Sequence, residues 1–100
     1  MDDNSIVELL LAAQRALLGE VVPSLRGVAV EWNNHTILIY FYNDGEVLPE
    51  LWNDYSCIGT EVVASFSTAY IKEKIIRLDY PNKLPEHKYW AYRRKEIPLY

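Results

Sequence analysis

The sequence lacks most of the features that identify an enzyme, a membrane protein or a secreted protein. Its single cysteine, Cys57, excludes an internal disulfide and a cysteine-rich zinc site. Its four glycines stand singly and form no phosphate-binding loop. No apolar run approaches the roughly 20 residues that a membrane-spanning helix needs. The acidic start, Met1-Asp2-Asp3-Asn4, lacks the basic residues of a secretory signal. We therefore expect a cytoplasmic protein that folds on an apolar core, without metal or cofactor.

What the sequence does contain is the apolar content of one domain and an uneven distribution of charge. Its 100 residues, of which 50% are hydrophobic, are expected to form a single domain, 1–100. Residues 1–61 carry a net charge of -8 and residues 62–100 a net charge of +4, which gives -4 for the chain. The acidic balance disfavours the whole protein as a polyanion binder. Two explanations of the asymmetry stay open, namely ion pairs between the halves and a polarity used in binding.

The spacing of apolar residues predicts the element order α-β-β-α-β-β. The first helix begins after the candidate caps Asp2-Asp3-Asn4-Ser5 and ends before Gly19, a natural stop. Pro23 and Gly27 break the chain before the first strand, and Pro49 suits the first turn of the second helix. The predicted elements are a helix over 6–17, strands over 28–32 and 37–42, a helix over 49–66, and strands over 71–78 and 89–95.

These elements indicate an α+β fold in which two helices pack on one face of a mainly antiparallel four-stranded sheet. Because side chains alternate along a strand, the odd-numbered residues of 37–41 share the core face. Leu38, Tyr40 and Tyr42 then lie on the opposite face. In the second helix, a side roughly 120° from the apolar one is acidic and expected to face solvent. That side consists of Glu50, Asp54, Cys57 and Glu61.

No catalytic or metal-binding constellation stands out. His35 and His87 match no metal-ligand or nucleophile spacing, and both are expected to be solvated. The acidic neighbours of Cys57 disfavour the thiolate that a nucleophile needs. Glu46 and Glu50 could in principle act as acid and base, but no desolvating pocket is evident around them. We therefore expect that the protein is not an enzyme.

Two surface features are not explained by the core. Tyr40 and Tyr42 lie near several carboxylates, which suits a protein interface, although an open sheet face also carries tyrosine for cross-strand packing. In the segment 88–95, basic and aromatic residues interleave as in single-strand nucleic-acid binders. The same alternation also fits an ordinary strand.

Several blocks of the sequence resemble a family of small bacterial immunity proteins, those of contact-dependent growth inhibition and related polymorphic toxin systems. The resemblance covers most of residues 9–96. It implies a non-enzymatic cytoplasmic inhibitor that binds the toxin domain of its own system and covers the active site or another essential surface. The blocks that carry it are 17–23, 25–31, 39–45, 60–66, 75–81 and 92–96.

On this hypothesis the acidic character of the chain has a function. Many delivered toxins are nucleases, whose active sites must be basic to hold phosphates, so an acidic inhibitor can occupy the cleft. We expect carboxylates to steer association with a basic toxin C-terminal domain and aromatic residues to act as anchors. The predicted partner-binding residues are Tyr40, Tyr42, Asp44, Glu46, Glu50, Trp52, Asp54 and Glu61.

Two alternatives remain open. The first is a small nucleic-acid-binding regulator that uses the basic C-terminal strand, which the net negative charge disfavours. The second is a homodimeric structural domain that joins sheet edges.

Overall fold

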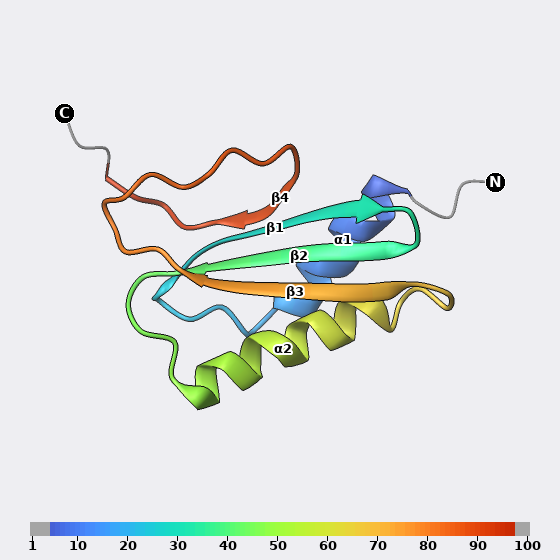
Figure 1. Cartoon of the computed structure of the whole chain (residues 1–100), viewed down its shortest axis with the longest axis horizontal. Helices are drawn as coiled ribbons and strands as arrows, with labels where there is room; N and C mark the ends of the chain where they lie inside the picture. Colours follow the sequence, from blue (N-terminus) through green and yellow to red (C-terminus); the bar gives the residue numbers. More distant parts are fainter. Residues whose placement is uncertain (1–4, 98–100) are drawn as a thin grey trace.

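The structure is a computed structural model that describes residues 5–97. The candidate caps Asp2, Asp3 and Asn4 lie outside the described residues, whereas Ser5 is the N-cap of the first helix. Its hydroxyl oxygen accepts a hydrogen bond from the backbone N–H of Glu8 (3.2 Å). The predicted element order is confirmed (Figure 1). The elements are α1 (Ile6–Leu17), β1 (Leu25–Asn33), β2 (Thr36–Asn43), α2 (Pro49–Val63), β3 (Tyr70–Arg77) and β4 (Trp90–Arg93).

The four strands form one sheet in the order β3-β2-β1-β4. β1 pairs antiparallel with both β2 and β4, so the prediction of a mainly antiparallel sheet is confirmed. β2 and β3 pair parallel, because α2 returns the chain to the end of the sheet at which β2 began. Both helices cover one face, with α1 over β1 and β4 and α2 over β3 and β2 (Figure 1). Neither described helix has the length and apolar character needed to cross a membrane.

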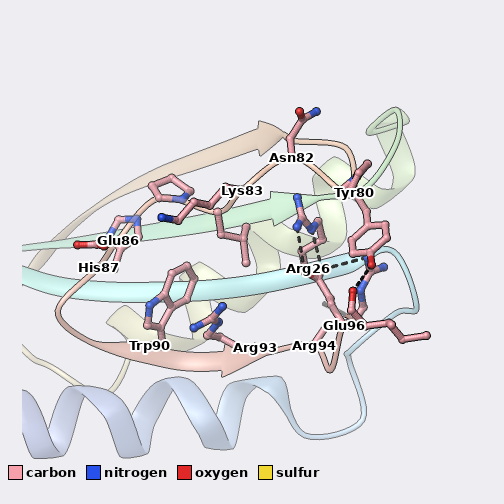
Figure 2. A pocket seen from close by; sticks show the side chains of 14 residues that line it. Arg26, Tyr80, Asn82, Lys83, Glu86, His87, Trp90, Arg93, Arg94 and Glu96 are labelled. Carbon is pink, nitrogen blue, oxygen red and sulfur yellow. Dashed lines mark hydrogen bonds and ion pairs between the residues drawn. The ribbon is translucent and has the colours of Figure 1, made fainter. Parts of the chain in front are cut away.

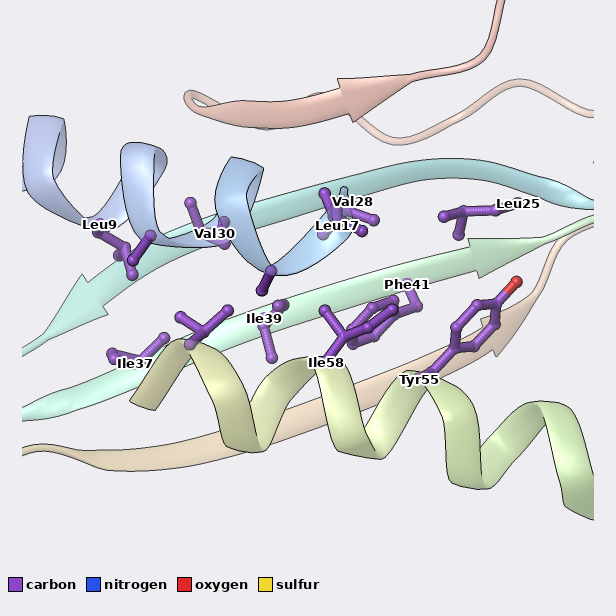
Figure 3. Close-up of a cluster of buried hydrophobic side chains, with 14 residues drawn as sticks. Leu9, Leu17, Leu25, Val28, Val30, Ile37, Ile39, Phe41, Tyr55 and Ile58 are labelled. Carbon is purple, nitrogen blue, oxygen red and sulfur yellow. The ribbon is translucent and has the colours of Figure 1, made fainter. Parts of the chain in front are cut away.

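The core lies between the sheet and the two helices. The odd-numbered residues of 37–41 are fully buried, as the alternation predicts, and Val28 and Val30 of β1 join them. Tyr55 of α2 stacks on Phe41 with 4.9 Å between ring centroids. Figure 3 shows these side chains directed into the space between β1, β2 and α2. Burial of this apolar surface is the main force that holds the helices on the sheet.

The strand predicted over 89–95 is shorter in the structure, where β4 is Trp90–Arg93. Two other predicted boundaries are wrong by three residues, and tertiary contacts explain both errors. α2 ends at Val63, so Phe66 lies beyond the helix, where its ring meets Trp32 edge-on at 5.3 Å. Gly27 does not break the chain but lies inside β1, opposite Tyr42. A β-carbon at Gly27 would lie 2.8 Å from the ring of Trp90, so the missing side chain makes room for that ring.

Candidate functional site

The charge asymmetry of the sequence becomes an asymmetry between two faces of the molecule. We call α1, α2 and the segments that join them to the sheet the helix layer, and the side of the sheet that carries no helix the open face. β3 places Lys72 and Lys74 on the open face, in register with Leu38 and Tyr40 of β2. Among the described residues the helix layer exposes one cation, Arg15. The carboxylates that it exposes belong to Glu8, Glu20, Glu46, Glu50, Asp54 and Glu61.

Glu50, Asp54 and Glu61 form a line along α2 that we call the acidic stripe. All three are exposed, as predicted, and their spacing places them on one flank of the helix. On the opposite flank, Ser56 donates a hydrogen bond to Glu73 of β3 (2.9 Å). The acidic stripe therefore lies on the side of α2 that faces α1, and within residues 5–97 none of its members forms an ion pair.

Asp44 differs from the other predicted carboxylates because its oxygens are used inside the fold. One oxygen accepts a hydrogen bond from the backbone N–H of Tyr80 (3.1 Å), and the other pairs with Arg94 (3.2 Å). This pair joins the acidic and basic halves of the sequence, so ion pairing between the halves is confirmed at this position. Asp44 therefore fastens the C-terminal segment to the end of β2.

Trp52 lies on a different flank of α2 from the acidic stripe. At about 100° per residue, it is rotated by about 200° from Glu50 around the helix axis. Its side chain is 51% exposed, beside the exposed Leu48 one helical turn earlier. The structure thus leaves Trp52 accessible without placing it among the carboxylates.

Tyr40 and Tyr42 lie on the open face, on the other side of the sheet from the acidic stripe. The segment between β3 and β4 covers them: the ring centroid of His87 lies 4.6 Å from that of Tyr40, and its Nε2 lies 2.6 Å from the Tyr42 hydroxyl. Tyr42 is only 3% exposed as a result. The prediction that His87 is solvated is wrong, whereas His35 is exposed in its turn as predicted. Nothing in the local sequence around His87 signals this contact.

The partial burial of His87 makes the free energy of unfolding depend on pH. Burial lowers the pKa of His87 below its ordinary 6.5, an effect that the carboxylate of Glu31 partly offsets. As the pH falls, the unfolded chain therefore takes up a proton at His87 before the folded chain does. The contribution of neutral His87 to the free energy of unfolding is complete above about pH 6.5 and decreases as the pH falls toward the lowered pKa. We expect H87Q to cost on the order of 1 kcal/mol at neutral pH and to flatten this slope, measured by urea unfolding between about pH 7.5 and 5. An unchanged slope in H87Q would assign the pH dependence to other groups.

The segment between β3 and β4 also forms one wall of an open cleft of about 970 Å³, and β1, β4 and the residues after β4 line the rest (Figure 2). Two of its basic residues are already neutralised. Arg26, 2% exposed, donates to both carboxylate oxygens of Glu96 (2.7 and 2.9 Å) and to the carbonyl of Leu78 (2.8 Å). Arg94 pairs with Glu96 and Asp44. The Arg26 guanidinium holds the pKa of Glu96 below its usual range. These polar groups join the C-terminal segment to β1, and the sequence did not reveal them because Arg26 and Glu96 lie far apart along the chain.

Comparison with protein families adds to this description of exposed charged surfaces. A family model described as MafI2 immunity protein matches residues 6–96, a range that includes both helices and the four strands given above. The chain belongs to the MafI2 immunity protein family. Comparison with curated proteins gives no match. The resemblance to bacterial immunity proteins of polymorphic toxin systems is thus confirmed, while contact-dependent growth inhibition stays a prediction.

For a MafI2 immunity protein, the implied partner is a toxin, and family membership favours a non-enzymatic role. The structure distributes the predicted partner-binding residues over separate places. The acidic stripe and Glu46 lie on the helix layer, Trp52 lies on the other flank of α2, Asp44 is engaged in an ion pair, and Tyr40 and Tyr42 lie on the open face. One flat contact surface cannot reach both sides of the sheet, so these residues do not form a single site.

Proposed function

We propose that this immunity protein binds and neutralises a cognate nuclease-type toxin domain by covering its basic active site with the helix layer. The observation that carries the proposal is the set of exposed carboxylates on that layer, of which Glu46 and the acidic stripe have no ion-pair partner in the described part of the chain. Such groups attract a phosphate-binding cleft over several ångströms and give specificity against its Lys and Arg side chains. Trp52 supplies an aromatic contact at the margin.

The biological setting belongs to the same proposal. The toxin is delivered by contact-dependent growth inhibition or a related route, and the immunity protein meets it in the cytoplasm. We expect expression of the toxin gene beside this one to kill cells, and co-expression of this chain to restore growth. A neighbouring product that is harmless alone, or lethal in the presence of this chain, would refute the immunity role.

The acidic stripe is tested by a charge-neutralising pair. E50Q together with D54N should slow association with the purified toxin domain by about tenfold at low salt and reduce the dependence of the rate on ionic strength. The matched control, K72Q with K74Q, removes two exposed charges from the open face and should leave association within about twofold. Equal rates for the wild type and the acidic pair would remove the stripe from the interface.

A further inference from the structure

The helix α1 is apolar on two sides, although a helix on a sheet needs only one apolar side. Its core side is buried and rich in alanine, with Ala12, Ala13 and Ala16 among the core residues. On the opposite side, Val7, Leu11 and the C-cap residue Leu18 are 62%, 47% and 76% exposed. Their spacing of four and seven residues aligns them along the outer surface. We call these three residues the apolar ridge.

An exposed ridge of this kind marks an interaction surface. A helix that is apolar around most of its circumference is normally covered, and exposed apolar side chains aligned on one side of a helix indicate a partner. α1 and α2 pack side by side, and the flank of α2 that faces α1 carries the acidic stripe. The apolar ridge and the carboxylates of Glu50, Asp54 and Glu61 thus belong to one surface of the helix layer. An apolar centre with a charged margin is the usual composition of a specific protein interface.

We propose that the apolar ridge is the anchoring part of the toxin interface, and that it packs against an apolar strip of the toxin bordered by Lys and Arg side chains. This inference rests on the proposed function. Charge decides between the toxin and a second copy of this chain as the occupant. Two copies joined through the helix layer would bring carboxylates against carboxylates. Among the described residues, Arg15 is the one exposed cation of this layer that could offset their repulsion. A basic toxin surface, by contrast, complements the carboxylates.

The experiment measures binding of the full-length chain to the toxin domain encoded beside it, by surface plasmon resonance. The double variant L11Q and L18Q should dissociate about tenfold or more faster, with an association rate within about threefold of the wild type, because apolar anchors act mainly on dissociation. The matched control is Y70Q, which changes a ring on the open face that is at least as exposed as Leu11 and should bind like the wild type. Since the altered side chains are exposed, the thermal unfolding midpoints of both variants should stay near that of the wild type.

The outcomes separate this inference from the proposed function. If the wild type binds and E50Q with D54N slows association, but L11Q with L18Q leaves dissociation unchanged, the ridge is not the anchor although the immunity role stands. If the wild type does not bind the toxin, both proposals are overturned. If light scattering shows a dimer of the wild type that L11Q with L18Q converts to a monomer, the ridge belongs to a second copy and this inference is wrong.

Discussion

Replacing Glu96 with glutamine is expected to lower the free energy of unfolding by about 3 kcal/mol, a large part of the stability of a domain of this size. The reason is the burial of Arg26, which is 2% exposed and donates two hydrogen bonds to Glu96. E96Q removes the negative charge and leaves a desolvated guanidinium without its counter-ion. Urea unfolding at neutral pH measures the difference.

Two comparisons test the physical reason for that loss. D79N breaks the exposed pair of Arg77 with Asp79 and should barely change stability, because an exposed ion pair contributes little and the asparagine oxygen can still accept the hydrogen bond from the backbone N–H of Gly45 (2.8 Å). The double variant R26M with E96L replaces the buried pair by apolar groups and should be more stable than E96Q alone, since no buried charge is left over. A double variant that is less stable than E96Q would show that the network contributes through shape and hydrogen bonds to Leu78 rather than through charge.

The pair of Arg26 with Glu96 also predicts that the free energy of unfolding decreases in acid. Hydrogen bonds from Arg26 hold the pKa of Glu96 below its ordinary 4.5. The contribution of the carboxylate is therefore present above about pH 4.5 and is lost as the pH falls through the lowered pKa of the folded state. In E96Q this part of the acid sensitivity should be absent.

The second large effect is expected at Asn43, the last residue of β2. Its Oδ1 accepts hydrogen bonds from the hydroxyls of Tyr55 (2.6 Å) and Ser24 (2.9 Å), and its Nδ2 donates to the carbonyl of Gly45 (3.1 Å). N43A should cost about 2–3 kcal/mol, because it leaves the fully buried Tyr55 hydroxyl without an acceptor. The same burial raises the pKa of Tyr55 to about 12.

A double-mutant cycle isolates this hydrogen bond. Y55F removes the hydroxyl while keeping the ring that stacks on Phe41. N43A should therefore cost clearly less in the Y55F background than in the wild type. If the two changes lower the free energy of unfolding additively, Asn43 stabilises the fold through its contacts with Ser24 and the 44–45 turn instead.

The sequence predicted the elements well because their apolar residues repeat locally. The odd-numbered residues of β2 and the acidic stripe of α2 follow from the periods of strand and helix, and each lies where those periods place it. Errors occurred where distant residues interact. Gly27 was predicted to break the chain, but it lies in a strand where its missing side chain makes room for the Trp90 ring. Phe66 continues the helical spacing of apolar residues, but it lies beyond the helix and packs on Trp32.

The candidate site shows the same division. The spacing of Glu50, Asp54 and Glu61 predicts that they share one side of the helix. It does not show that Asp44 plays a different part, because the ion pair of Asp44 is with Arg94, 50 positions along the chain. The sequence predicts Tyr40 and Tyr42 as exposed anchors, because no residue near them in the chain indicates that His87 packs over them. The sequence did not single out the apolar ridge of α1, because apolar residues occur around most of this helix and only the structure shows that Leu11 and Leu18 stay exposed.

The amino-acid sequence alone determined the element order, the inner faces of the strands and the acidic side of the second helix, because local periodicity carries that information. The resemblance to immunity proteins rests instead on specific blocks of the sequence, such as 39–45 and 75–81. Only the tertiary structure decided which charged side chains take part in ion pairs within the fold and which stay exposed. A carboxylate or an aromatic ring becomes a binding group or a structural one according to its spatial neighbours, and segments far apart in the chain supply those neighbours. Asp44 and Tyr42 thus belong to the fold, whereas Glu50, Asp54 and the apolar ridge are left exposed on the helix layer.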